Sequence, residues 1–293
     1  MDVVITYVDG TDPLWKRDFL ETTGQETRPR RYRDWGTLQF LLRGLEKHLK
    51  GMGKLFLVVA RESQAPGWID RREVEVVLHG DIVPKELLPT FNSTTIELFL
   101  HRIPGLSERF LYFNDDCFLM EDACEEDFFP GGLPATGFAR HLFASNLYKK
   151  QVRRSDVLAC KALGKVPPLF FLRPQHSCLP CLRCAGDELF GRMGPQIMAS
   201  LTTLREPQNP NFYIFLDYLR RSGRAKRRRL DSRHISLQAV SPDVLRRAIT
   251  EPRAQLLCLG DVEMGPERYQ KLRNAMMVAF MKRYPDVSRF EKY

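Results

Sequence analysis

The stretch LPTFNSTTIELFLHRIPGLSERFLYFNDDCF, residues 88–118, decides the fold of this chain. Its first half has helical spacing over 92–103, and an Asn or Ser stands at the start, where a helix needs a capping side chain. Its second half is an apolar run at 109–113 that ends in the acidic turn 114–116. The stretch therefore predicts a helix, a buried strand and an acidic turn in succession.

Strand and helix patterns also alternate before this stretch. Short apolar runs predict strands at 2–8, 54–60 and 74–79, and a leucine pattern predicts a helix at 34–49 that Asp34 could cap. This alternation is typical of a parallel sheet with helices on its faces, in which ligands bind beyond the carboxyl ends of the strands. We therefore expect an α/β fold with a mainly parallel sheet.

The chain is expected to form one catalytic domain over 1–293 with three parts. Residues 1–137 form the α/β core, and residues 138–232, mixed and basic, form a helical and loop elaboration. Residues 233–293 contain a Ser-Pro helix start, an apolar strand and an amphipathic helix, so this part is expected to return to the core.

Composition limits the class of protein. The 293 residues are 43% hydrophobic, enough for a full core, and no window approaches the roughly 20 apolar residues of a membrane span. The start lacks the basic region of a signal peptide. We therefore expect a cytoplasmic protein, with possible peripheral contact at the inner face of the membrane, and the net charge of +9 favours an anionic partner.

Seven cysteines, an odd number, suit free thiols in a reducing compartment. Cys178, Cys181 and Cys184 have the spacing of metal ligands, with His176 as a fourth candidate. Pro180 stiffens the short loop between them, and structural zinc sites usually join two separate pairs. Both interpretations stay open.

Acidic residues follow two of the expected strands. Asp115 and Asp116 could hold Mg²⁺ or Mn²⁺ on a diphosphate, because hard cations prefer oxygen ligands. Asp9 could contact a nucleotide or the metal. Each of these acids could instead simply end a strand in a turn. Their shared position on one rim of the sheet favours a ligand site.

A histidine and an arginine stand next to each other on the predicted helix. His101 could take a proton from an attacking hydroxyl, and Arg102 could stabilise phosphate charge. Neighbouring helical positions diverge by about 100°, so the two side chains do not both face one point. A single helical histidine is more often solvated or buried than catalytic.

Four blocks of the sequence resemble the Stealth family: VVITYVDGTDPLW, RYRDWGTLQFLLRGLEKH, the stretch at 88–119 and the terminal MKRYPDVSRFEK. That family comprises bacterial capsular polysaccharide phosphotransferases and the catalytic part of eukaryotic N-acetylglucosamine-1-phosphotransferase. The resemblance implies a Rossmann-like nucleotide-sugar-transferase core. It also implies transfer of hexose-1-phosphate, with N-acetylglucosamine-1-phosphate favoured, from a UDP-sugar to an acceptor sugar of a capsular or cell-surface polysaccharide, with release of UMP.

The resemblance also implies roles for individual residues. The catalytic group would be His101 as the base, with Arg33 and Arg102 on the phosphates. The metal ligands would be Asp115, Asp116 and Asp261, with Mg²⁺ or Mn²⁺ as cofactor. The substrate-binding residues would be Tyr7, Asp9, Gly10, Asp34, Asn92, Asn114, His176 and Arg205.

The chain departs from the family pattern, for example where Trp35-Gly36 replaces Asn and an acidic residue. Two alternatives therefore stay open: a metal-dependent glycosyltransferase that releases UDP, and a polyanion-binding protein without catalysis. The arginine-rich run 220–229 could contact anionic lipid, but it lacks interleaved aromatic residues and no nucleic acid partner is expected.

Overall fold

The structure is a computed structural model that describes residues 1–27 and 29–292. Its main sheet has the strand order β3-β2-β1-β4-β9, and the first four of these strands are parallel to one another. The last strand, β9, is antiparallel to β4 and closes one edge. These strands are β1 (Asp2–Thr6), β2 (Leu55–Val59), β3 (Val74–Leu78), β4 (Arg109–Asn114) and β9 (Leu179–Leu182).

Smaller strand groups surround the main sheet. In the sheet β11-β12-β5, the first two strands are parallel and the last is antiparallel. The strands β7 and β8 form an antiparallel pair, and β6 and β10 a short parallel pair. The bounds are β5 (Cys117–Leu119), β6 (Ala135–Thr136), β7 (Phe138–His141), β8 (Phe171–Pro174), β10 (Lys226–Arg227), β11 (Ser232–Ser236) and β12 (Leu256–Gly260).

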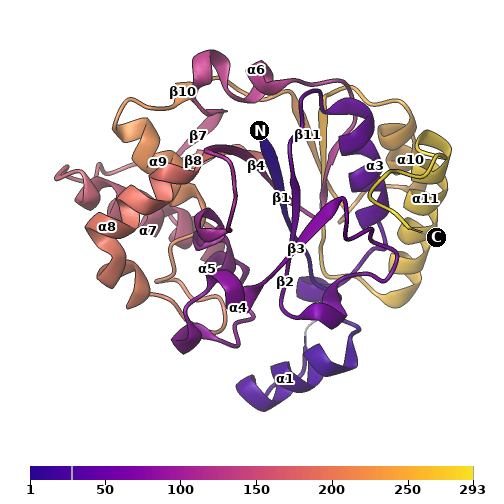
Figure 1. Ribbon diagram of the computed structural model, residues 1–293, viewed down its shortest axis with the longest axis horizontal. Coiled ribbons are helices and arrows are strands. Elements are labelled where there is room, and N and C mark those ends of the chain that lie inside the picture. Colours follow the sequence, from indigo (N-terminus) through magenta and orange to yellow (C-terminus); the bar gives the residue numbers. More distant parts are fainter. Residues whose placement is uncertain (28, 293) are drawn as a thin grey trace.

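Helices cover both faces of the sheet, which gives three layers (Figure 1). Because strand side chains alternate, Val3 and Ile5 face one helical layer and Val4 faces the other. One layer contains α3 (Leu38–His48), α10 (Pro242–Thr250) and α11 (Pro266–Arg283). The other contains α5 (Ser93–Leu98), α7 (Leu147–Ala162), α8 (Arg183–Met198) and α9 (Tyr213–Arg221).

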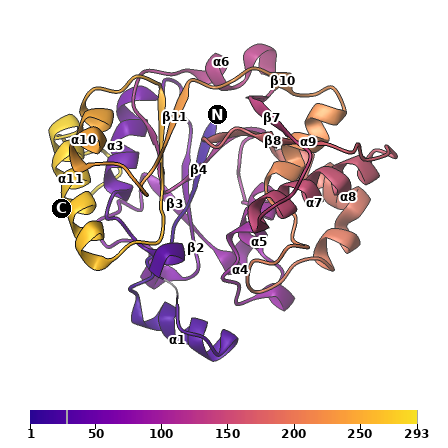
Figure 2. The same ribbon diagram turned by 180° about the vertical axis from the view of Figure 1, so that it is seen from behind.

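The remaining helices are short or lie at the edges of the molecule. Figure 2 shows α1 and α4 at the end of the molecule opposite α6 and β10. The α-helices are α1 (Pro13–Thr23), α2 (Pro29–Tyr32), α4 (His79–Ile82) and α6 (Glu125–Phe128). The 3₁₀ helices are η1 (Glu62–Gln64), η2 (Lys85–Leu87), η3 (Leu100–Arg102) and η4 (Pro130–Gly132).

The predicted α/β class with a mainly parallel sheet is confirmed, and the exceptions are local. The sequence reasoning missed α1, whose N-cap Asp12 accepts hydrogen bonds from the backbone of Leu14 and Trp15. The cap predicted for α3 is wrong. That helix begins after Thr37, and Asp34 instead accepts a hydrogen bond from the backbone N–H of Gly36 at 2.7 Å.

The helix of the deciding stretch is shorter than predicted. Asn92 is its N-cap, as expected, but the α-helix ends at Leu98 and a 3₁₀ turn, η3, follows. The change matters because a 3₁₀ helix rotates each residue by about 120°, whereas an α-helix rotates it by about 100°. Residues after Leu98 therefore do not continue the face of α5.

The region 138–232 contains β7 to β10, the helices α7 to α9 and the start of β11. Its strand β9 joins the main sheet, so this region is tied to the core by backbone hydrogen bonds. In the part of the chain that the structure describes, no helix is both long and apolar enough to cross a bilayer.

Candidate functional site

A cavity of about 830 Å³ opens beyond the carboxyl ends of the parallel strands. Residues that follow these strands line it: Tyr7 after β1, Ala60 after β2, His79 after β3 and Asp115 after β4. This is the edge at which ligands of parallel α/β sheets bind. The predicted position of the site, on the rim that carries the acidic turn, agrees with the cavity.

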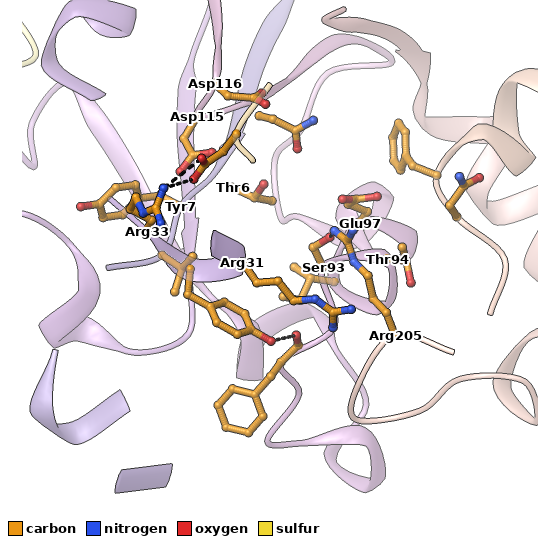
Figure 3. A pocket seen from close by; sticks show the side chains of 18 of the residues that line it. Thr6, Tyr7, Arg31, Arg33, Ser93, Thr94, Glu97, Asp115, Asp116 and Arg205 are labelled. Carbon is orange, nitrogen blue, oxygen red and sulfur yellow. Dashed lines mark hydrogen bonds and ion pairs between the residues drawn. The ribbon is translucent and has the colours of Figure 1, made fainter. Parts of the chain in front are cut away.

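An acidic pair forms one wall of the cavity (Figure 3). Shielding from bulk water raises the pKa of Asp115 to about 8, and the charges of Asp116, Asp34 and Asp261 add to this. Shielding likewise raises the pKa of Asp116 to about 6, and nearby His234 opposes the shift. Carboxyl groups in such surroundings favour either protonation or a bound cation.

One oxygen of the acidic pair is buried without a partner. Among the described residues, no hydrogen bond reaches Oδ1 of Asp116. A buried polar atom without a hydrogen bond destabilises the folded state unless a ligand binds to it. Asp115 and Asp116 therefore fit a divalent cation, which could complete its coordination with water and substrate oxygens.

The third acid proposed for the metal, Asp261, is paired with arginine. Its Oδ1 and Oδ2 lie 3.1 and 3.4 Å from the guanidinium of Arg33, and the indole N–H of Trp35 donates to Oδ2 at 3.3 Å. The guanidinium also lies 4.9 Å from the ring centre of Tyr269. Asp261 thus holds Arg33 at the cavity wall, next to the acidic pair.

The opposite wall carries cations and a buried glutamate (Figure 3). Ser93 and Glu97 lie one turn apart on α5, so they share a face of that helix. Arg205 donates a hydrogen bond to the Ser93 hydroxyl, and Arg31 extends into the space between the two walls. Burial raises the pKa of Glu97, and the charge of Arg205 opposes this.

Hydrogen bonds fix the floor of the cavity between these walls. The Tyr7 hydroxyl donates to Asp34 at 3.0 Å. The Tyr112 hydroxyl donates to Asn114 at 2.7 Å and lies 2.9 Å from the hydroxyl of Thr6. These side chains come from β1, β4 and the segment before α3, so the network joins the site to the sheet.

Two histidines stand near the acidic pair. His176 lines the cavity, and its ring centre is 5.5 Å from that of His234. Partial burial lowers the pKa of both rings, and Arg173 lowers them further. His176 therefore favours the neutral form near pH 7, in which an imidazole can accept a proton.

Three of the predicted substrate residues support the cavity from outside its lining. Asp9 caps its own turn by accepting hydrogen bonds from Thr11. Gly10 packs against the carbonyl oxygen of Tyr32, where a Cβ would stand only 2.1 Å away. Asn92 is fully buried and donates to the backbone of Thr202, which ties α5 to the segment before α9.

The structure does not bring the predicted base to the cavity. His101 lies on η3 and packs against α8, with its ring centre 5.0 Å from that of Phe190. Burial lowers its pKa to about 4, and Nδ1 has no hydrogen-bond partner among the described residues. Arg102 is exposed, with its guanidinium 4.8 Å from the ring centre of Phe99. Neither side chain lines the cavity.

The cavity nevertheless gathers most of the predicted residues. It is lined by Tyr7, Arg33, Asp34, Asn114, Asp115, Asp116, His176, Arg205 and Asp261. Sequence reasoning missed three charged residues of the lining, Arg31, Glu97 and Glu263. Glu97 could have been found from its spacing of four residues after Ser93, and Arg31 from its place at the start of the RYRD motif that predicted Arg33.

In the part of the chain that the structure describes, the cysteines are not arranged as metal ligands. The described cysteines are free thiols, and the Sγ atoms of Cys117 and Cys258 are 2.9 Å apart, at hydrogen-bonding distance. Cys181 donates to the carbonyl of Leu179. Within residues 1–27 and 29–292, no group of three or more His, Cys, Asp or Glu side chains could hold a metal.

Acidic side chains already neutralise part of the arginine-rich run 220–229. Arg220 and Arg221 bind the buried carboxylate of Asp156. Arg224 pairs with Glu188 at 2.7 Å. This part of the run stabilises the packing of α7, α8 and α9, which leaves fewer free charges for a polyanion.

Known proteins resemble part of the chain. Residues 31–134 match the family model described as Stealth protein CR2, conserved region 2. The receptor polysaccharide phosphotransferase WefC of Streptococcus oralis is 39% identical over 144 residues, 46% of this chain and 43% of that protein. The exopolysaccharide phosphotransferase cps2G of Lactiplantibacillus plantarum is 41% identical over 139 residues, 46% of this chain and 41% of that protein.

The fold and site define an α/β protein with a charged ligand cavity at the carboxyl edge of its sheet. The sequence matches confirm the resemblance to the Stealth family over the matched part of the chain. The matched part makes up less than half of each of these two relatives. Among solved structures, the galactosyltransferase LgtC is similar with a TM-score of 0.41 and 12% identity, over 94% of this chain and 96% of that chain.

Proposed function

We propose that this chain transfers a sugar-1-phosphate from a nucleotide diphosphate sugar to a hydroxyl group of an acceptor glycan, in the synthesis of a cell-surface polysaccharide. The observation that carries the proposal is the distribution of charge in the cavity. Asp115 and Asp116 line one wall, and Arg31 and Arg205 lie across from them. The names of the relatives, which are polysaccharide phosphotransferases, support the same reaction class.

The donor in this proposal is a UDP-sugar, with UDP-N-acetylglucosamine favoured. The acceptor oxygen forms a bond to the β-phosphorus, and the bond from that phosphorus to the bridging oxygen of the diphosphate breaks. UMP leaves with the electron pair of this bond, and the product is a phosphodiester. Positioning and neutralisation of charge supply most of the catalysis in reactions of this type.

A divalent cation, Mg²⁺ or Mn²⁺, would be held by Asp115 and Asp116. When bound, it would neutralise charge on the diphosphate, and few protein ligands suffice because Mg²⁺ keeps several waters and binds substrate phosphates. The unpartnered Oδ1 of Asp116 supports this assignment. Arg33, held by Asp261, would contact the phosphates from the same side.

We assign the base to His176 in place of His101. His176 lines the cavity, and burial keeps its ring neutral near pH 7, ready to take the proton of the acceptor hydroxyl. His101 is buried against α8 and lies outside the lining. Glu97 and Arg205, on the opposite wall, would bind hydroxyl and phosphate groups of the substrates.

The decisive experiment is to identify the products. The purified protein is incubated with Mg²⁺, UDP-N-acetylglucosamine and a panel of short acceptor glycans, and the products are analysed by phosphorus NMR and nucleotide chromatography. The proposal expects UMP and a phosphodiester. Release of UDP would instead identify a glycosyltransferase. Salt-sensitive polyanion binding without turnover of any UDP-sugar would support the non-catalytic alternative.

A further inference from the structure

Four large apolar side chains on one side of the molecule are largely exposed to solvent. The exposed fractions are 63% for Leu142, 80% for Phe143, 89% for Val166 and 88% for Leu169. Single exposed apolar residues are ordinary, but several on neighbouring loops mark an interaction surface. We name Leu142, Phe143, Val166 and Leu169 the apolar tip.

Strand pairing brings the two loops of the apolar tip together. In the antiparallel pair of β7 and β8, His141 lies opposite Phe171. The loop that leaves β7 at Leu142 and the loop that enters β8 after Phe170 therefore emerge from the same end of the pair. Figure 1 shows this pair on the side of α7, α8 and α9, away from α10 and α11.

The surroundings of the apolar tip are strongly basic. Residues 138–173 contain eight Lys and Arg residues and one acidic residue, Asp156. That carboxylate is fully buried and binds Arg220 and Arg221, so it does not offset the charge outside. Exposed cations flank the tip, among them Arg140, Lys150 and Lys165.

We infer that the apolar tip and its flanking cations bind the surface of an anionic lipid bilayer. Apolar side chains on loop tips can enter the boundary between headgroups and acyl chains, while basic side chains remain among the anionic headgroups. This surface differs from the arginine-rich run 220–229, where several charges are already neutralised by Asp156 and Glu188.

The position of the tip also has a consequence for the cavity. The residues that follow its first loop, Asn146 to Tyr148, begin α7 and line the cavity. Contact with a bilayer through the tip therefore holds the cavity close to the membrane surface, where an acceptor attached to a lipid would be within reach. The inference does not depend on the proposed reaction, because it concerns only binding to lipid.

The test is co-sedimentation of the whole chain with vesicles at low and high salt. One set of vesicles contains phosphatidylcholine alone, and the other contains phosphatidylcholine with phosphatidylglycerol. The tip variant carries Phe143→Ser and Leu169→Ser. The matched control carries Val278→Ser and Met281→Ser, which change exposed apolar residues of α11 on the other side of the molecule. A third variant carries Arg227→Ser and Arg229→Ser.

We expect binding to the anionic vesicles that falls with salt, at least about tenfold weaker in the tip variant and unchanged in the α11 control. Circular dichroism and donor binding should match the wild type, which separates lost lipid contact from misfolding. If the wild type did not sediment with the anionic vesicles at low salt, the inference would be overturned. Normal binding by the tip variant, or a loss confined to the Arg227 and Arg229 variant, would also overturn it.

Discussion

His101 lies directly against the backbone of Gly186. A Cβ on this glycine would stand 2.2 Å from Cγ of the imidazole, so α8 can approach η3 this closely only because the residue has no side chain. The histidine that looks most reactive in the sequence therefore fills a space between two helices. The cavity takes its charge from other residues.

The contact predicts that His101 and Gly186 affect stability. Gly186→Ala should lower the free energy of unfolding by about 1–3 kcal/mol, because the added methyl group cannot fit. His101→Ala should lower it by a similar amount, because it leaves a cavity. Both are measured by urea denaturation, and the folded variants should keep most of their UMP release. A folded His101→Ala protein with normal stability but no turnover would restore His101 as the base.

His176 is predicted to act in the chemical step. His176→Gln should reduce kcat for UMP release by about 10²–10⁴-fold, because it removes the proton acceptor, while donor binding stays within a few-fold of the wild type. Calorimetry of UDP-sugar binding and single-turnover kinetics measure the two effects separately. His141→Gln is a suitable control, since that histidine lies outside the cavity lining. If the rate of His176→Gln equalled that of the wild type, His176 would not be the base.

The acidic pair predicts a stability that depends on pH. Folding raises the pKa of Asp115 to about 8, so the folded state binds this proton more tightly than the unfolded state does. Without a cation, this group therefore costs stability progressively as the pH rises from about 4 to about 8. Asp115→Asn should raise Tm at pH 8 by on the order of 5 °C and change it little at pH 4.

Mg²⁺ should act on the same group in the opposite direction. A bound cation favours the charged carboxylates, so Mg²⁺ should raise the Tm of the wild type more at pH 8 than at pH 5. The shift should shrink in Asp116→Asn. Differential scanning fluorimetry with Mg²⁺, and with K⁺ at equal ionic strength as control, measures it. Equal shifts in the wild type and in this variant would contradict a cation at the acidic pair.

Arg33 and Asp261 are predicted to act as a pair. A double-mutant cycle of Arg33→Met and Asp261→Asn should give a coupling energy of about 1–3 kcal/mol in stability. Because Asp261 holds Arg33, its loss should raise the KM for the donor with little change in the Mg²⁺ concentration needed for half-maximal rate. A large rise in that concentration, comparable to that in Asp116→Asn, would instead identify Asp261 as a metal ligand.

Local sequence was sufficient for much of the fold. The apolar runs before and within residues 88–118 form the parallel strands, because each has the length and β-branched content of a buried strand. Asn92 and Ser241 cap α5 and α10 as expected, since capping depends on hydrogen bonds within three residues. The acidic turn lies at the carboxyl edge because parallel strands end there together.

Tertiary structure decided which side chains meet. The sequence by itself determined the α/β class, the acidic turn and the resemblance to the Stealth family. The change from α-helix to 3₁₀ helix after Leu98 turns His101 away from Glu97. The packing of α8 against η3 then buries its side chain. Likewise, Asp261 meets Arg33 across 228 positions of the chain, and no local pattern encodes that distance. Long-range contacts depend on how whole layers pack, so they emerge only in the folded molecule.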